Sequence, residues 1–328
     1  MNPMFSVIIP THGRLDYLAE ALQSVLAQTE SDWECLVISD LPAEFEAAQS
    51  LVDGFKDSRL RFFRGDRPGA NASRNKGMDQ STGSIYCFLD DDDLWTPDKL
   101  SQHRLAHLQA DLVYSATFSR YDKPFVYDLY KEKKGQSRDQ MLEAMKQFRG
   151  CPHSASCCTL DRKALGEARW DEQLSSFQDW DFWFQILVAG PRTVKHIPKP
   201  LAIIREHSGT RTSRGLEKRL ENIQRLSEKY SKLLTPSVVQ WRIQQETFLH
   251  LRTLSAQGNR GQAIQVALYQ WKFRKESSQA PLPLAKVIRA LLSPKPNSRM
   301  GFHILRAWYR LTRRKHALRR IPAESSTL

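Results

Sequence analysis

The chain has 328 residues, 41% of them apolar, and its eight tryptophans and fifteen phenylalanines can build a substantial core, which excludes a wholly disordered protein. Its formal net charge is +13, from 49 basic and 36 acidic side chains. No acidic residue lies between Glu276 and Glu324, so the C-terminal tail is strongly basic and favours a polyanionic partner, either anionic lipid or nucleic acid.

The first two hundred residues alternate short β-rich runs with segments of helical periodicity. In the first helical segment, Leu15, Leu18, Leu22 and Val25 recur every three or four residues. This βαβα rhythm indicates an α/β fold, in which a mostly parallel sheet has helices on both faces and binds ligands beyond the carboxyl ends of its strands. We predict strands over 5–10, 33–39, 60–64 and 84–89, and helices over 14–28, 44–55, 71–83 and 96–108.

The pattern changes near residue 212, where amphipathic helical stretches replace the alternation. We therefore predict an α/β domain over 1–211, a smaller helical accessory region over 212–280 and a basic amphipathic tail over 281–328. The stretches of helical spacing in the accessory region are 216–234, 238–257 and 260–275.

The tail has the pattern of a helix that lies in the plane of an anionic membrane surface, with apolar side chains on one face and arginines on the other. A helix packed on the protein with a solvated basic face is the alternative. Nucleic-acid binding is not expected, because no reader motif accompanies the charge. The apolar residues of the tail are Ile304, Leu305, Trp308, Leu311 and Leu318.

We expect the protein in the cytoplasm, either free or bound peripherally to the inner face of the plasma membrane. No run approaches the ~20 apolar residues that cross a bilayer, and the first residues lack the pattern of a signal peptide. The five cysteines are typical of buried thiols in a reducing compartment. A zinc site can be drawn from Cys151, His153, Cys157 and Cys158, but neighbours on a strand face opposite ways, so Cys157 and Cys158 are not expected to share a metal.

The run CFLDDDDLW, residues 87–95, places four carboxylates directly after an apolar strand. Adjacent negative charges repel one another, so the run becomes favourable where a hard divalent cation neutralises it. Mg²⁺ and Mn²⁺ prefer oxygen ligands and commonly combine one or two carboxylates with phosphate oxygens. The run therefore predicts a metal site shared with a diphosphate; a solvated acidic turn that caps the next helix is the alternative.

Six elements follow one another along the chain: SVIIPTHGR (6–14), Asp40, GANASRNKG (69–77), GSIYCFLDDDDLWTPDKL (83–100), FQDWDFWFQIL (177–187) and IPKPLAIIREH (197–207). In order and approximate spacing they resemble family 2 of the glycosyltransferases, over about residues 4–209. The resemblance implies a GT-A fold and an inverting hexosyl transfer. The donor would be a nucleoside-diphosphate sugar, expected to be a UDP-sugar. The acceptor would be a hydroxyl of a glycan or lipid-linked molecule in cell-surface polysaccharide synthesis.

The resemblance also implies the residues of the site. Asp92 is expected to bind Mg²⁺ or Mn²⁺ directly, Asp90 to contact the ribose or the metal, and His207 to complete the metal site. Asp40 is expected to accept hydrogen bonds from the uracil or ribose. The donor-binding residues that the family pattern implies are Pro10, Thr11, Asp40, Arg74, Asn75, Asp90 and Asp91.

The segment FQDWDFWFQIL resembles the element of the family that supplies the general base. Asp179 aligns with the carboxylate that takes the proton of the acceptor hydroxyl, and Asp181 is the second candidate. Residues two apart on a helix point to different faces, so the two acids are expected to have different roles. A helix N-cap is the structural alternative for Asp179. Trp180, Phe182 and Trp183 are predicted to be core residues.

The chain departs from the usual family pattern at SDLPA (39–43), which replaces Asp-Asp-Gly-Ser, and at Gln178 and Gln185, which replace Glu and Arg. The aspartates are retained, so an active enzyme is expected. A haloacid-dehalogenase-like phosphatase is the alternative enzyme, but its first Asp would follow the first strand, and Leu94 occupies its Thr/Val position. A basic nucleic-acid-binding protein is the third possibility.

Overall fold

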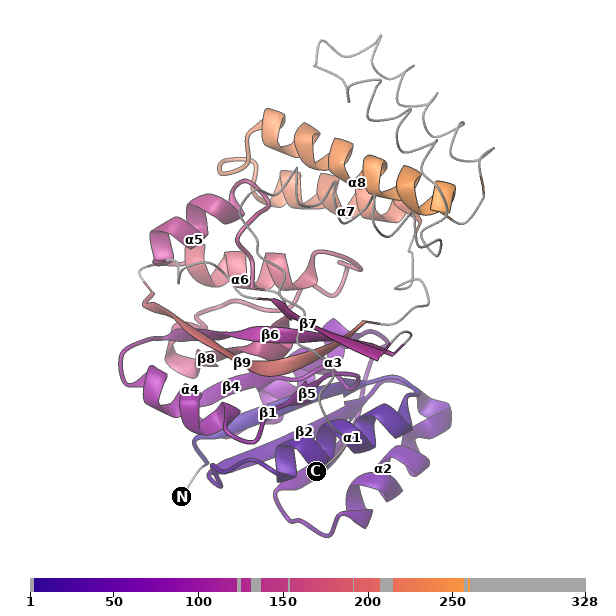
Figure 1. The fold of residues 1–328 in the computed structure, drawn as a ribbon, viewed down its shortest axis with the longest axis vertical. Helices are drawn as coiled ribbons and strands as arrows, with labels where there is room; N and C mark the ends of the chain where they lie inside the picture. Colours follow the sequence, from indigo (N-terminus) through magenta and orange to yellow (C-terminus); the bar gives the residue numbers. More distant parts are fainter. Residues whose placement is uncertain are drawn as a thin grey trace. The chain divides into compact units, whose positions relative to one another are not determined.

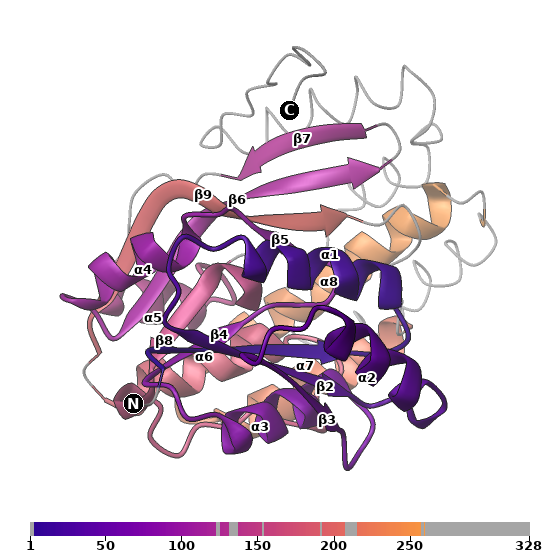
Figure 2. The same ribbon diagram turned by 90° about the horizontal axis from the view of Figure 1, so that it is seen from below.

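The computed structural model describes residues 3–256, apart from 123–124, 131–136, 153, 191 and 207–214, together with Asn259. The chain divides into two compact units, and the division falls between Arg211 and Thr212. Figures 1 and 2 show the ribbon from two directions.

A nine-stranded mixed sheet is the framework of the first unit. The strand order is β3-β2-β1-β4-β8-β6-β9-β5, and β7 pairs with β6 outside this path. The strands are β1 (Phe5–Thr11), β2 (Trp33–Ser39), β3 (Leu60–Arg64), β4 (Ile85–Phe88), β5 (Leu94–Trp95), β6 (Leu112–Asp122), β7 (Phe125–Tyr130), β8 (Cys158–Asp161) and β9 (Val194–Glu206).

The first four strands are parallel, as the alternation of strands and helices predicts. β1 pairs with β2 and β4, and β2 pairs with β3. Every residue of β1 and β2 is buried, as expected for parallel strands that are covered on both faces. Both ends of each of the four predicted strands lie within one residue of the observed bounds.

The other half of the sheet is mixed, which differs from the mostly parallel sheet that we expected. β8 runs antiparallel to β4 and β6, β6 is parallel to β9, and β5 and β7 are antiparallel to their neighbours. Residue periodicity identifies a strand but does not identify its partner, so the sequence did not indicate these antiparallel pairs.

Helices cover both faces of the parallel half, and Figure 2 shows α1 and α3 on opposite sides of β1. The four helices predicted for this region are all present, with bounds shifted by up to three residues. The helices of the first unit are α1 (Leu15–Leu26), α2 (Phe45–Gly54), α3 (Ala70–Gln80), α4 (Lys99–His107), α5 (Arg138–Met145) and α6 (Gln178–Val188).

Helix α3 packs closely on the sheet because a glycine lies at the contact. A Cβ atom at Gly77 would lie 2.4 Å from Ile8 Cγ2 and 2.9 Å from Ile38 Cδ1. Both isoleucines are fully buried in neighbouring strands. The missing side chain lets the helix approach β1 and β2, which sets the position of Arg74 one turn earlier on the same helix.

The apolar face of α6 joins an aromatic core. Phe182 and Trp183 are fully buried. The ring of Trp170 stacks on Phe182 with centroids 4.3 Å apart and meets Phe88 edge-on at 5.1 Å. Trp180 is also buried. The prediction that the aromatic residues of α6 are core residues is confirmed.

None of the five cysteines is in a disulfide bond. Cys157 closes the short helix η2 (Ala155–Cys157), while Cys158 begins β8, and their Sγ atoms are 3.8 Å apart. The expectation that these thiols face opposite ways is therefore wrong, because Cys157 is not on the strand. His153 lies outside the described residues. Among the described residues, the group suited to a metal ion consists of carboxylates and includes no thiol.

The second unit contains the paired helices α7 (Leu216–Lys229) and α8 (Pro236–Ala256). The buried carboxylate of Glu246 on α8 joins them through an ion pair with Arg219 of α7 at 2.5 Å. The same carboxylate also pairs with Arg242, one turn earlier on α8. The helix predicted over 260–275 and the tail over 281–328 lie outside the described residues. Within the described ranges, no helix has both the length and the apolar character needed to cross a membrane.

Candidate active site

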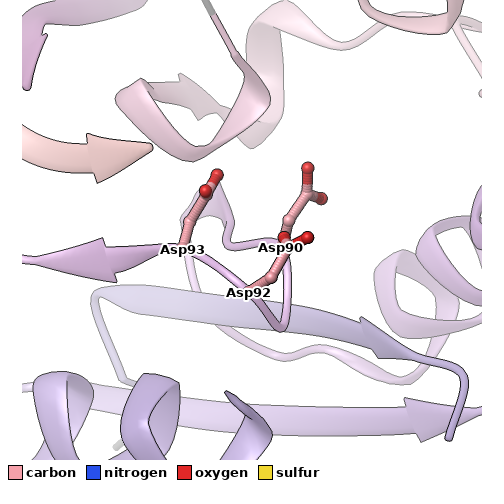
Figure 3. Close-up of side chains that lie close together, drawn as sticks. All are labelled: Asp90, Asp92 and Asp93. Atoms are coloured by element: carbon pink, nitrogen blue, oxygen red, sulfur yellow. The ribbon is translucent and has the colours of Figure 1, made fainter. Parts of the chain in front are cut away.

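The four aspartates form a turn between β4 and β5, at the carboxyl end of the parallel strands. Figure 3 shows three of them, Asp90, Asp92 and Asp93. A 3.0 Å backbone hydrogen bond from Asp93 N to the Asp90 carbonyl closes the turn. One carboxylate oxygen from each of Asp90, Asp92 and Asp93 lies within 4.8 Å of the other two. The side chains of Asp90 and Asp92 are 31% and 16% exposed, so both are accessible from solvent, although Arg74 pairs with Asp90 and Arg14 with Asp92.

Asp93 fixes the turn to the neighbouring backbone and side chains. Its carboxylate accepts hydrogen bonds from Ser156 Oγ at 2.6 Å and from Arg205 N at 3.1 Å. Ser156 Oγ also accepts the Asp90 N–H at 3.1 Å, and its carbonyl accepts the Trp95 indole N–H at 2.8 Å. Burial, followed by the nearby charges of Asp90 and Asp92, raises the pKa of Asp93 well above its usual range. Ser156 therefore holds both ends of the turn, a role that its sequence context did not reveal.

Asp91 faces the protein interior and ties the turn to β1. It is fully buried, and its carboxylate accepts a 2.8 Å hydrogen bond from Thr11 Oγ1. Arg14 pairs with the other oxygen. Burial raises the pKa of Asp91 to about 6, although Arg14 and Thr11 oppose this shift. Thr11 and Asp91, both predicted to bind the donor, therefore contact each other across the site.

A pocket of about 200 Å³ lies beside the acidic turn. Its walls come from the ends of β1 and β2, the start of α3 and the turn itself, as expected for the carboxyl edge of an α/β sheet. Its lining includes all the predicted donor-binding residues except Asn75. The lining residues are Pro10, Thr11, His12, Arg14, Asp40, Ala70, Ser73, Arg74, Asp90, Asp91 and Asp92.

Asp40, directly after β2, is held in a fixed orientation at the pocket wall. One carboxylate oxygen lies 2.6 Å from His12 Nδ1, and the other accepts the backbone N–H of Gly69. Leu41 and Pro42 follow in place of the usual Gly-Ser, and Pro42 begins a short helix η1 (Pro42–Glu44). His12 thus contributes to the site, although it was not among the predicted site residues. Its place in segment 6–14, next to Pro10 and Thr11, could have indicated this role.

Arg74 connects the acidic turn to the region of the candidate base. Its guanidinium is buried, lies 2.6 Å from Asp90 Oδ1 and stacks over Trp170 at 4.5 Å from the ring centroid. Burial would lower the pKa of Arg74, but the carboxylates of Asp90 and Asp179 outweigh burial and raise it. Arg74 therefore stays charged and lies within electrostatic reach of both carboxylates.

Asn75 is not brought to the pocket. Its side-chain amide donates to the Trp170 carbonyl at 2.9 Å and to Glu172 Oε1 at 3.1 Å, and its carbonyl oxygen accepts the Trp170 N–H at 3.0 Å. These bonds hold the loop that supports Trp170, the ring on which Arg74 lies.

The two acids of α6 have different environments, in agreement with their spacing. Asp179 lies in the first turn and is partly exposed. Asp181 is fully buried and accepts a 2.8 Å hydrogen bond from Gln185 Nε2. The position before the helix is Phe177, whose φ of 62° is in the left-handed region, so the N-cap is Phe177 and not Asp179. A non-glycine residue in this region costs about 1–3 kcal/mol.

The exposed part of the acidic turn suits a divalent cation. Asp90 and Asp92 offer hard oxygen ligands within a few ångströms of each other, at the wall of an open pocket. Both oxygens of Asp93 already accept hydrogen bonds, so Asp93 orients the turn. His207, the expected third ligand, lies outside the described residues.

Comparison with known proteins identifies relatives of the α/β domain. Residues 6–168 match Glycosyl transferase family 2. WcaA of Escherichia coli K12, assigned by its name to colanic acid biosynthesis, is 37% identical over 33% of this chain and 39% of its own length. EpsH of Bacillus subtilis, named as a glycosyltransferase, is 25% identical over 77% of this chain and 76% of its own. The matches to the first relatives span between 27% and 39% of those proteins.

Solved structures share the fold. S. aureus TarS 1-349 in complex with UDP-GlcNAc has a TM-score of 0.55 at 17% identity and covers 74% of this chain and 71% of the TarS chain. This likeness confirms the predicted α/β fold class of GT-A type, while the family match favours a glycosyltransferase over the phosphatase and nucleic-acid-binding alternatives.

Proposed function

Residues 6–168 of this chain belong to glycosyltransferase family 2, and from that premise we propose that the protein is an inverting, metal-dependent hexosyltransferase. It would transfer a sugar from a UDP-sugar to a hydroxyl of a glycan or lipid-linked acceptor, in cell-surface polysaccharide synthesis. One observation carries the proposal: Asp40, Arg74 and Asp92, from three separate segments, converge on a single pocket at the carboxyl edge of the sheet.

The nucleoside end of the donor is assigned to the β1 and β2 side of the pocket. Asp40 is oriented by His12 and by the N–H of Gly69, so its carboxylate is positioned to accept hydrogen bonds from uracil or ribose. Pro10 and Thr11 form the neighbouring wall. The UDP-GlcNAc complex of TarS, a protein of the same fold, supports a uridine nucleotide.

The diphosphate end is assigned to Arg74 and the acidic turn. Asp92, with Asp90, would hold Mg²⁺ or Mn²⁺, and His207 remains the proposed third ligand. When bound, such an ion neutralises the charge that develops on the departing diphosphate. Arg74 supplies a fixed positive charge at the same wall. Asn75 contributes to donor binding indirectly, because it holds the loop of Trp170, the ring on which Arg74 lies.

Asp179 is the proposed base. It takes the proton of the acceptor hydroxyl as the oxygen bonds to the anomeric carbon, while the bond from that carbon to the nucleoside diphosphate breaks on the opposite face. Partial exposure at the start of α6 leaves Asp179 accessible to an acceptor, whereas Asp181 is fully buried and bonded to Gln185. Asp181 therefore serves to position the helix.

The direct test is ligand-dependent thermal stability. UDP-, GDP- and dTDP-sugars are added to the full chain with and without Mn²⁺, and Asp92→Ala is measured beside it. We expect the UDP-sugar with Mn²⁺ to raise the melting temperature most, and Asp92→Ala to abolish the Mn²⁺-dependent part. Nucleotide binding that is unchanged by excess EDTA and by Asp92→Ala would refute the metal-dependent mechanism.

A further inference from the structure

Arg14 lines the pocket and forms ion pairs with the acidic turn. It lies in the loop between β1 and α1, and its guanidinium pairs with the carboxylates of Asp91 and Asp92. Asp91 is fully buried, whereas the Arg14 side chain is 42% exposed and lines the pocket. Arg14 therefore reaches the turn from the side that is open to a ligand.

This pairing supplies the neutralisation that the aspartates need. A guanidinium presents its donors in a planar fork that can bridge two carboxylates, and it stays charged at every physiological pH. Burial opposes the charge on Arg14, but Asp91, Asp92 and Asp90 outweigh burial and raise its pKa. The repulsion within the turn is thus relieved by a side chain of the chain itself.

The same pairing competes with a bound metal. Asp92, the proposed direct ligand, uses its carboxylate to accept from Arg14. A divalent cation bound to Asp92 would lie next to the Arg14 guanidinium, and two neighbouring positive charges repel each other. A metal on Asp92 therefore weakens the pair between Arg14 and Asp92, and a donor diphosphate in the same pocket offers the guanidinium a replacement anion.

We propose, on the basis of the function assigned above, that Arg14 is a resident counter-cation of the acidic turn. It neutralises Asp91 and Asp92 in the free enzyme, releases Asp92 to the divalent cation, and then donates to the diphosphate of the donor. Metal and nucleotide consequently bind with positive coupling, because the nucleotide draws away the side chain that blocks the metal ligand. By linkage, the metal raises nucleotide affinity by the same factor.

The test is titration of Mn²⁺ by electron paramagnetic resonance, with and without UDP, on the full chain. Arg14→Gln is expected to bind Mn²⁺ alone on the order of tenfold more tightly than the wild type, and to lose most of the gain that UDP provides. Arg14→Lys keeps the charge but replaces the planar fork of donors by a single ammonium group, so a smaller tightening is expected. Arg104→Gln, which removes a surface pair with Glu30 outside the pocket, is the matched control and should leave both affinities unchanged.

The outcomes separate the two proposals. If the wild type shows no UDP-dependent Mn²⁺ binding, the assigned function fails and this inference with it. If that binding is present but Arg14→Gln binds Mn²⁺ alone no more tightly than the wild type, only the role of Arg14 is overturned. Should Arg14→Gln fail to fold, equal Mn²⁺ affinity of Arg14→Lys and wild type gives the same negative answer.

Discussion

Gly77 is the position at which one methyl group would separate α3 from the sheet. Its new Cβ would lie 2.4 Å from Ile8 Cγ2 and 2.9 Å from Ile38 Cδ1. Alanine favours a helix over glycine by about 1 kcal/mol, but an extra group in a packed core costs about 1–3 kcal/mol. Ile8 is fully buried on a central strand, so the upper part of that range applies. Gly77→Ala should therefore lower the free energy of unfolding by about 1–2 kcal/mol.

Urea denaturation followed by tryptophan fluorescence measures this difference. Gly54→Ala is the matched control, because the same substitution at the end of α2 meets nothing within 4 Å. The control should be neutral or stabilising by up to about 1 kcal/mol. Gly77→Ala should also weaken UDP binding, since a displaced α3 moves Arg74 away from Asp90. Equal urea midpoints for the two variants would refute the close-contact reasoning.

Three further perturbations test other parts of the molecule. Burial alone would raise the pKa of Glu34, but hydrogen bonds from Thr82 and Ser6 outweigh burial and lower this pKa. The Glu34 carboxylate therefore stabilises the fold at pH values above its unfolded pKa of about 4.3. This stabilisation is lost as the pH falls through the folded pKa of Glu34. Glu34→Gln should flatten the loss of stability between about pH 5 and 3 in urea midpoints, and an unchanged profile contradicts this. Asp179→Asn should reduce sugar transfer at least ~100-fold while calorimetry shows UDP binding nearly intact; full turnover would assign the base to another carboxylate. If the basic tail holds the enzyme on the inner membrane face, the full chain should float with anionic liposomes and a truncation after residue 296 should not; both remaining in solution rejects the membrane role.

The parallel half of the fold was accessible from sequence because its signals are local. The strands over 33–39 and 60–64 match the observed β2 and β3, since apolar β-rich runs bounded by helical periodicity have few other interpretations. The acidic turn was equally accessible. Four adjacent carboxylates after an apolar strand have a physical meaning that does not depend on the rest of the chain.

The remainder depends on contacts between distant segments. β8 inserts between β4 and β6, about seventy residues after β4 in the chain, and no periodicity encodes that neighbour. Ser156 is an ordinary polar residue until the fold places it beneath Asp90 and Asp93. Arg14 is likewise one of many arginines in this basic chain, and its role emerges only when β1 and the acidic turn lie side by side.

The position of Arg74 has a consequence for attempts to redesign this protein. One guanidinium pairs with Asp90 on the proposed donor side and interacts electrostatically with Asp179, the proposed base on the acceptor side. Neutralising either carboxylate changes the field felt by the other, so substitutions on the two sides will not combine additively. Libraries that aim to alter sugar choice and acceptor choice should therefore vary both sides together around an unchanged arginine.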